Sequence, residues 1–390
     1  MNKQQTTQIQ WKEIELNTIC DVRDGTHDSP KYLDTGYPLI TSKNLVNGII
    51  DFQNVNYISE EDYIKINKRS FVDNGDIIMP MIGTIGNPIL VEKKQDFAIK
   101  NVALIKFNNK NISNKYIKYV LSSSYFEDYI LKKSRGGTQK FLSLSDIRAV
   151  LIPIPYKDNK PDLETQKRIV EKLEIAEKLK ENRKKADELT KEYLNSVFLE
   201  MFGDPFKNSF SWKKEELKKH VILINGRAYS QHELLDSGTQ IIRIQNLNGG
   251  NNWYYSNLNL PENKYCNKGD LLFAWSGTFG PFIWNSERSI YHYHIWKLEL
   301  KNSINKNYIY YFLSLLSENI KKSGHGGIIT HKTKESMDKL LIPIPPIQLQ
   351  NEFAKIVEGV EQLKEFQLKS KEEIDNLYNK LMQQAFKGEL

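Results

Sequence analysis

The pentapeptide LIPIP occupies residues 151–155 and occurs again at residues 341–345, 190 positions further along the chain. Proline at alternate positions keeps the backbone extended and disfavours a helix in the residue just before it. Each copy is followed by a long stretch dense in charged residues. The pentapeptide therefore predicts the same event twice, namely a strand whose end leads to the start of a long helix.

The sequence on the N-terminal side of each pentapeptide repeats as well. The corresponding segments are RGGT (135–138) and HGGI (325–328), NISNKYIKYVL (111–121) and SINKNYIYYFL (303–313), and NGDIIMPMIGTIG (74–86) and KGDLLFAWSGTFG (268–280). The order is kept while the offset drifts, as changes in loop length would produce. We infer a duplication of one long unit, because a solenoid would show several shorter periods.

Short strands broken by turns, followed by an amphipathic helix, predict a mixed domain of about 130 to 150 residues in each unit. We expect an α+β protein in which two tandem mixed α/β target-recognition domains are joined by two long antiparallel helices, with an internal pseudo-twofold repeat. The predicted bounds are 1–155 for the first domain, 156–206 for the first spacer helix, 207–345 for the second domain and 346–390 for the second spacer helix.

Apolar residues after each pentapeptide recur at steps of three and four, which is typical of a coiled-coil seam. The expected seam residues are Ile169, Ala176, Leu179, Ala186, Tyr193 and Val197 in the first helix and Phe353, Ile356, Val360, Leu363, Ile374, Leu377 and Leu381 in the second. Arg183 and Gln367 are polar seam positions that could fix the register. About 35 residues at ~1.5 Å each give a rod of roughly 50 Å. The alternative is that the two helices pack on separate cores.

Composition narrows the class of protein. No run of about 18 apolar residues exists, so a membrane span is not expected. The first residues hold no apolar signal core, and the chain has only two cysteines, so we expect a reducing cytoplasm. Residues 1–150 contain 20 Lys and Arg against 17 Asp and Glu, and residues 207–342 contain 18 against 11. These two basic blocks favour a polyanionic partner.

Motifs for catalysis are missing from the sequence. There is no Asp/Asn-Pro-Pro-aromatic loop of an amino-methyltransferase, no GxxxxGK[ST] phosphate loop and no HExxH or CxxC metal spacing. PDLETQK (161–167) resembles a nuclease carboxylate–lysine set, but its members are too close together and open a helix, where acids favour the dipole. His292 and His294 could be metal ligands, yet no acidic residue stands nearby in the sequence. We expect no catalytic residue and no metal site.

Polar and basic residues in glycine-rich loops are the candidates for DNA contact, because Arg, Lys, Asn and Gln suit phosphates and base edges. They occur at corresponding places in two basic blocks, which makes solvated turns a weaker interpretation. The first block offers Thr26, His27, Ser42, Lys43, Asn44, Thr84, Arg135, Thr138, Gln139 and Lys140; the second offers Arg227, Arg243, Gln245, Asn246, Ser276, Thr278, His325, His331 and Lys332.

The chain resembles the specificity subunit of a type I restriction–modification system over nearly its whole length. The resemblance rests on two variable domains, each followed by an apolar-Pro-apolar-Pro strand and a Gln-containing helix start: LIPIPYKDNKPDLETQKRIVEKLE and LIPIPPIQLQNEFAKIVEGVE. The GTIG and GTFG loops and the GGT-like turn also resemble target-recognition domains of that family. The first copy departs by inserting YKDNK, and Gln348 stands where the family commonly has an acid.

The resemblance implies that each domain reads one half of a split, asymmetric sequence in double-stranded DNA. The two helices would set the spacing and dock two methyltransferase (M) subunits, which carry S-adenosylmethionine. Separate restriction and motor (R) subunits would use ATP and Mg²⁺. No cofactor is expected on this chain, which would be a non-catalytic reader. Two alternatives remain, a self-contained methyltransferase or nuclease with unrecognised motifs and a coiled-coil assembly protein without a DNA role.

Overall fold

The computed structural model of the chain describes residues 9–83, 85–133, 141–322 and 333–390. It divides into two compact units, unit 1 (Met1–Arg183 with Ser370–Leu390) and unit 2 (Lys184–Lys369). This division cuts through both long helices, so it does not test the domain bounds predicted from the sequence, which remain a prediction. Within the described residues, no helix is long and apolar enough to cross a membrane.

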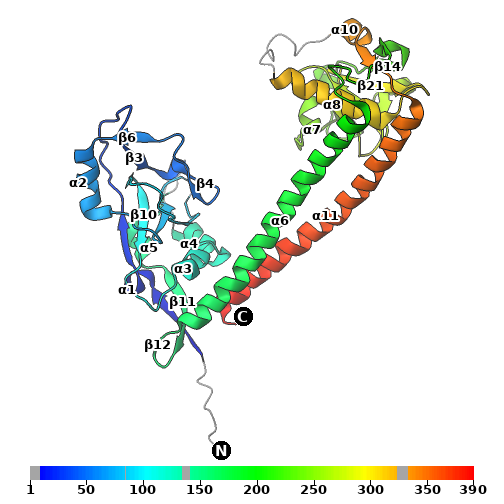
Figure 1. Cartoon of the computed structure of the whole chain (residues 1–390). Coiled ribbons are helices and arrows are strands. Elements are labelled where there is room, and N and C mark those ends of the chain that lie inside the picture. Colours follow the sequence, from blue (N-terminus) through cyan, green and yellow to red (C-terminus); the bar gives the residue numbers. More distant parts are fainter. Residues whose placement is uncertain (1–8, 84, 134–140, 323–332) are drawn as a thin grey trace, which may run out of the picture. The chain divides into compact units, whose positions relative to one another are not determined.

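Unit 1 holds three small sheets with the strand orders β1-β11-β12, β2-β10-β7-β8 and β6-β3-β9, and a β4-β5 hairpin. Its elements are β1 (Gln10–Glu15), α1 (Leu16–Ile19), β2 (Asp21–Asp24), β3 (Tyr37–Ile40), η1 (Ser42–Asn44), β4 (Leu45–Val46), β5 (Ile49–Ile50), β6 (Asn56–Ile58), α2 (Glu60–Ser70), β7 (Ile77–Pro80), β8 (Ile89–Leu90), β9 (Ala98–Ile99), β10 (Val102–Lys106), α3 (Asn114–Leu121), α4 (Ser124–Lys133), α5 (Leu144–Arg148), β11 (Leu151–Lys157) and β12 (Lys160–Pro161) (Figure 1).

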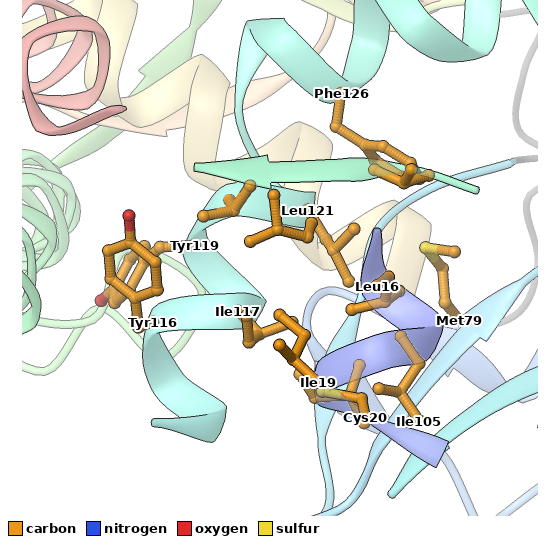
Figure 2. Close-up of a cluster of buried hydrophobic side chains, with 14 of the residues drawn as sticks. Leu16, Ile19, Cys20, Met79, Ile105, Tyr116, Ile117, Tyr119, Leu121 and Phe126 are labelled. Atoms are coloured by element: carbon orange, nitrogen blue, oxygen red, sulfur yellow. The ribbon is translucent and has the colours of Figure 1, made fainter. Parts of the chain in front are cut away.

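The largest core of unit 1 lies where α1, α3 and α4 meet strands β7 and β10 (Figure 2). Leu16 and Ile117 are fully buried there, and Met79 and Ile105 reach them from the strands. The apolar face of the amphipathic helix predicted from the sequence packs into this core. The segment NKYIKYVLSSSYFEDYILKK (114–133), whose pattern predicts one amphipathic helix, forms two helices, α3 and α4, because the chain turns at the Ser122–Ser123 pair.

Unit 2 repeats the arrangement with the orders β13-β22, β14-β21-β18-β19 and β16-β15-β20-β17. Its elements are β13 (Lys214–Glu216), η2 (Leu217–Lys219), β14 (Val221–Asn225), η3 (Gln231–Glu233), β15 (Thr239–Ile242), α7 (Ile244–Leu247), β16 (Tyr254–Ser256), η4 (Glu262–Lys264), β17 (Tyr265–Cys266), β18 (Leu271–Ala274), β19 (Gly280–Ile283), β20 (Ser289–Tyr291), β21 (Ile295–Leu300), α8 (Lys306–Lys322), α10 (Lys334–Asp338) and β22 (Leu341–Pro343). The four-stranded order β2-β10-β7-β8 thus recurs as β14-β21-β18-β19, which confirms the duplication.

Both LIPIP segments form strands, as the sequence predicts. β11 pairs antiparallel with β1, and β22 pairs antiparallel with β13. In each copy, the carbonyl oxygen of the first proline accepts a hydrogen bond from a fully buried tyrosine, with Tyr116 donating to Pro153 at 2.6 Å and Tyr308 donating to Pro343 at 2.7 Å. Each LIPIP strand is therefore fixed to the helix, α3 or α8, that carries this tyrosine.

A buried glutamine at the start of each long helix makes a second connection. Gln166 Oε1 accepts from the backbone N–H of Ser113 at 2.9 Å, and Gln350 Oε1 accepts from that of Asn305 at 2.8 Å. Both glutamines are 0% exposed. Because an unpaired buried amide is costly, this glutamine ties the N-terminus of α3 or α8 to the long helix that follows.

The long helices are α6 (Leu163–Phe202) and α11 (Ile347–Lys387), and in each unit they run in opposite directions (Figure 1). In unit 1, Lys180 pairs with Asp375 at 2.9 Å, and in unit 2, Gln367 donates to Thr190 at 2.9 Å. The predicted mutual packing of the two helices is thus confirmed.

Several residues predicted for the seam lie outside it. Leu179, Tyr193, Leu363 and Leu377 are 41–52% exposed. The seam runs through neighbouring positions such as Leu173, Thr190 and Leu194, which are buried. Gln367 lies in the seam, as predicted. Its partner across the seam is Thr190, a buried polar position that counting of apolar residues passed over.

Candidate nucleic-acid interface

The candidate DNA-contacting residues follow the ends of strands that meet at one place in each unit. In unit 1, β3 and β9 run parallel, and in unit 2, β15 and β20 do the same. Carboxyl ends of parallel strands lie at the same edge of a sheet, so the loops after them converge. We call these segments the strand-end loops, residues 25–30, 41–44 and 100–101 in unit 1 and residues 226–230, 243–246 and 292–294 in unit 2.

In unit 1, a buried carboxylate organises the first loop. Asp24, 5% exposed at the end of β2, forms ion pairs with Arg69 from α2 and with His27, whose Nε2 lies 2.8 Å away. The other ring nitrogen of His27 lies 2.9 Å from Asn101 Oδ1. The hydrogen bonds to Asn101 and Asp24 raise the pKa of this exposed histidine, so the cationic form is favoured beside the loop. Thr26 lies next to it, half-buried.

These side chains line a cavity of about 520 Å³ between residues 24–30 and α2. Its basic members are His27, Lys65 and Arg69, and its acidic members are Asp24, Asp28 and Asp62. Two of the carboxylates are already used, since Asp24 is paired twice and Asp62 accepts from the helix-capping hydroxyl of Ser59.

The asparagines of the second loop serve the loop itself. Asn44 is 5% exposed, accepts from the backbone N–H of Thr41 at 3.0 Å and donates to the carbonyl oxygen of Asn54. Asn246 is 7% exposed and repeats the pattern, accepting from the N–H of Arg243 and donating to the carbonyl oxygen of Asn252. With their amides committed, both residues shape the loop. Their exposed neighbours are Lys43 in unit 1 and Gln245 in unit 2, where Gln245 Nε2 also donates to the carbonyl oxygen of Asn252 at 2.9 Å. Ser42, beside Lys43, is half-buried.

Unit 2 places two arginines at its strand ends. Arg227 pairs with Glu233 at 2.6 Å, and its guanidinium lies over the ring of Tyr229. Arg243 lies 4.2 Å from the ring centroid of Tyr254. Among the described residues, Arg227 Nη1 and Arg243 Nε are buried without a hydrogen-bond acceptor. Such N–H groups are costly unless a ligand or water accepts from them.

The SGTFG loop adjoins this cluster. Thr278 Oγ accepts from Asn248, the residue that follows α7, at 2.8 Å, whereas Ser276 is buried. The corresponding Thr84 in unit 1 lies outside the described residues. So do the glycine-rich turns with Arg135, Thr138, Gln139, Lys140, His325, His331 and Lys332. Whether any candidate touches DNA remains a prediction.

His292 and His294 lie in the third loop of unit 2, with ring centroids 4.8 Å apart. Burial, with His294 and Arg243 nearby, lowers the pKa of His292 to about 4, so its ring is neutral at pH 7. In the part of the chain that the structure describes, no group of three His, Cys, Asp or Glu side chains is placed to hold a metal ion.

Three residues near the loops were missed from the sequence, namely Arg69, Lys100 and Trp275. Arg69 stands in a polar helix and Lys100 follows a two-residue strand, so neither carries a motif. The segments FAIKN (97–101) and SIYHY (289–293) correspond in the repeat. Aligning them would have matched Lys100 with His292, and so would have shown that a cation in the first copy is replaced by a histidine in the second.

A family model described as the type I restriction modification DNA specificity domain matches residues 8–191 and 211–376. The chain belongs to this family. The type I restriction enzyme MjaVIII specificity subunit of Methanocaldococcus jannaschii is 23% identical over 93% of this chain and 91% of its own. The EcoBI specificity subunit of Escherichia coli is 25% identical over 37% of this chain and 31% of its own.

Solved structures share the fold of this family member. A chain from a study of complex assembly and conformational transition of the type I R-M system aligns over 100% of both chains, with a TM-score of 0.67 and 18% identity. The S subunit of the type I restriction–modification system from M. genitalium aligns over 99% of this chain and 98% of its own, with a TM-score of 0.52 and 16% identity. The predicted α+β architecture of tandem domains and long helices is confirmed.

Proposed function

We propose that this chain is the DNA-specificity subunit of a type I restriction–modification complex, and that each unit reads one half of a bipartite, asymmetric site. Family membership is the observation that carries the proposal. The strand-end loops support it, since each unit gathers polar and basic side chains at the same edge of its sheet. Unlike residues at matching places, such as Lys43 and Gln245, favour unlike half-sites.

We further propose that the long helices dock two methyltransferase subunits. In unit 2, Leu189, Tyr193, Leu363 and Phe366 are 48–69% exposed. Helical spacing puts Leu189 and Tyr193 on one face of α6 and Leu363 and Phe366 on one face of α11. The Thr190–Gln367 hydrogen bond sets these pairs at the same level of the two helices. We call this surface the unit 2 patch.

A matching surface, the unit 1 patch, occurs in the other unit. It comprises Ile175, Leu179 and Leu377, which are 41–64% exposed. Leu179 and Leu363 correspond, because each lies 13 residues after the buried glutamine of its helix. Exposed apolar patches of this kind mark protein interfaces, and two equivalent patches suit two copies of one partner.

Catalysis would then reside in the partners. We propose that this chain binds no cofactor, that S-adenosylmethionine is held by the methyltransferase subunits, and that ATP and Mg²⁺ serve the restriction and motor subunits. Cys20 and Cys266 are free, buried thiols, in keeping with a reducing cytoplasm.

Methylation mapping of the genome with and without this gene tests the proposal. We expect one bipartite motif to lose its methylation when the gene is deleted, and to regain it on complementation. Exchanging residues 207–342 for the matching block of another family member should alter one half of that motif only. Methylation or cutting by the purified chain alone, with cofactor and metal supplied, would overturn the proposal.

A further inference from the structure

The two units share one backbone crossing at their strand-end loops. In unit 1, the N–H of Thr26 donates to Ile99 O at 3.0 Å, and the N–H of Asn101 donates back to Thr26 O at 3.2 Å. In unit 2, the N–H of Arg227 donates to Tyr291 O at 3.1 Å, and that of Tyr293 donates back to Arg227 O at 3.0 Å. Each pair forms a parallel bridge, Thr26 with Lys100 and Arg227 with His292.

The glycine before each bridge makes this crossing tight. A Cβ added to Gly25 would lie 2.4 Å from Ile99 O, and one added to Gly226 would lie 2.2 Å from His292 O. Both contacts are with backbone atoms, so neither can be relieved by moving a side chain. Positions 26 and 227 are therefore structurally equivalent, and so are 100 and 292.

At these equivalent positions, the cationic residue lies on opposite sides of the bridge in the two units. Unit 1 carries Thr26 opposite the cation Lys100, whereas unit 2 carries the cation Arg227 opposite His292, which is neutral at pH 7. Each bridge thus holds one positive charge, although the residue that supplies it differs. A charge kept at the same place by different residues indicates a requirement for charge rather than for one side chain.

Both cations keep hydrogen-bonding capacity unused. Lys100 is only 8% exposed, and its Nζ donates to Ser29 Oγ at 2.7 Å. An ammonium group has three donors, and no carboxylate of the described residues lies within 4.0 Å of Nζ. Arg227 likewise has a buried Nη1 without an acceptor in the described structure. A buried ammonium without an anion is unfavourable, so this arrangement suits an anionic ligand.

We propose that Lys100 and Arg227 are equivalent phosphate anchors, each binding one backbone phosphate of the DNA half-site that its unit reads. The inference rests on the proposed function, because it takes DNA as the ligand. It adds that both half-sites are gripped at the same point of the fold, whatever bases the neighbouring loops contact.

Both cations are held against their own unit, which favours a phosphate over a base edge as the ligand. Base edges lie at the floor of a groove about 8.5 Å deep, so only side chains that project far from the protein reach them. Lys100 is buried, and Arg227 is held against Glu233 and Tyr229. Phosphates protrude from the duplex, so they can meet a cation that is held back in this way.

The test measures DNA affinity against salt for the complex of the full chain with its methyltransferase subunits. One fluorescent duplex carries the motif found by methylation mapping, and the other a scrambled sequence. Lys100→Gln should weaken binding to both duplexes by a similar factor and reduce the salt slope by about 1. Arg227→Gln should do the same, and the double variant should reduce the slope by about 2.

Two further variants separate charge from folding. Lys115→Gln removes a charge from the same unit, but Lys115 is exposed and paired with Glu174, so the slope should not change. Thr26→Arg combined with Lys100→His copies the unit 2 arrangement into unit 1 and should restore the slope that Lys100→Gln lowers.

Each possible result either supports or overturns the anchor or the proposed function. If the wild-type complex fails to prefer the motif duplex, the proposed function fails. If it prefers the motif but Lys100→Gln leaves the slope unchanged, only the anchor fails. A loss confined to the motif duplex would show a base contact instead. If Lys100→Gln does not fold, the slope of the charge-transposed variant decides alone, and a slope below that of the wild type overturns the anchor.

Discussion

The hydroxyl group of Tyr308 offers a sharp test of how the LIPIP strand is attached. Tyr308→Phe removes a single oxygen atom, keeps the ring stacked on Phe198 and leaves the carbonyl group of Pro343 without its 2.7 Å hydrogen bond. Tyr308 is 0% exposed, so water cannot replace the lost donor easily. An unsatisfied buried acceptor costs about 1–3 kcal/mol. For a unit of this size, about 2 kcal/mol corresponds to a fall in melting temperature of roughly 4–8 °C.

Differential scanning calorimetry of the full chain measures this change. Tyr116→Phe should lower the transition of unit 1 by a similar amount, because its bond to Pro153 is 2.6 Å long and just as buried. Tyr255→Phe is the matched control, since among the described residues its hydroxyl has no hydrogen-bond partner. A melting temperature within about 1 °C of wild type for both Tyr308→Phe and Tyr116→Phe would refute the reasoning.

Three other predictions address the interfaces, the pH response and the spacing. Phe366→Glu, at a 69% exposed position, should leave folding intact and reduce co-purification of the chain with the methyltransferase subunits. Gln362→Glu, at an exposed position of the same helix, is the control and should leave co-purification unchanged. Equal recovery of the methyltransferase subunits with both variants contradicts the unit 2 patch. Because the folded pKa of His292 is about 4, the unfolded chain binds a proton there between about pH 6.5 and 4 that the folded unit does not. Stability should therefore fall on acidification through this window, His292→Asn should flatten the curve, and an unaltered curve would count against a neutral His292. Inserting one heptad in each long helix adds about 10 Å, or about 3 base pairs, to the unread gap of the motif; an unchanged gap would show that the helices do not set it.

The architecture could be predicted from the sequence because the repeat is long and its proline and glycine residues mark where strands and helices end. Proline at alternate positions of LIPIP and the glycine-rich turns constrain the backbone locally, so their effect can be read without tertiary information. The order of the sheets could not be read in this way. It depends on which strands pair, as when β2 and β7 both join β10.

The seam between the long helices shows that the spacing of apolar residues alone did not identify the buried positions. Leu179 and Tyr193 fit a three-and-four stripe as well as the buried positions do, yet they are exposed. The helices instead bury Thr190, whose hydroxyl can accept from Gln367. A hydrogen bond across the interface can thus settle a register that apolar counting leaves ambiguous.

The candidate DNA contacts stay a prediction, but the structure shows which of these side chains are already used within their loops. Residue type pointed to Asn44 and Asn246, but each amide hydrogen-bonds backbone groups of its own loop. Lys100 carried no signal, because only the parallel crossing of β9 brings it opposite Thr26. Residue chemistry selects candidate loops, whereas the side chains that hold a loop in shape can be recognised only from hydrogen bonds between residues far apart in the sequence.

The paired attachments of the LIPIP strands have a consequence for how such genes can change. Pro153 and Pro343 are held by the same tyrosine contact, and Gln166 and Gln350 secure the same helix start. The block between the two copies of the pentapeptide begins with a glutamine that bonds to unit 1 and ends with a tyrosine that bonds to the second copy. A block from another gene that keeps this glutamine and this tyrosine would therefore find the same partners at both of its ends.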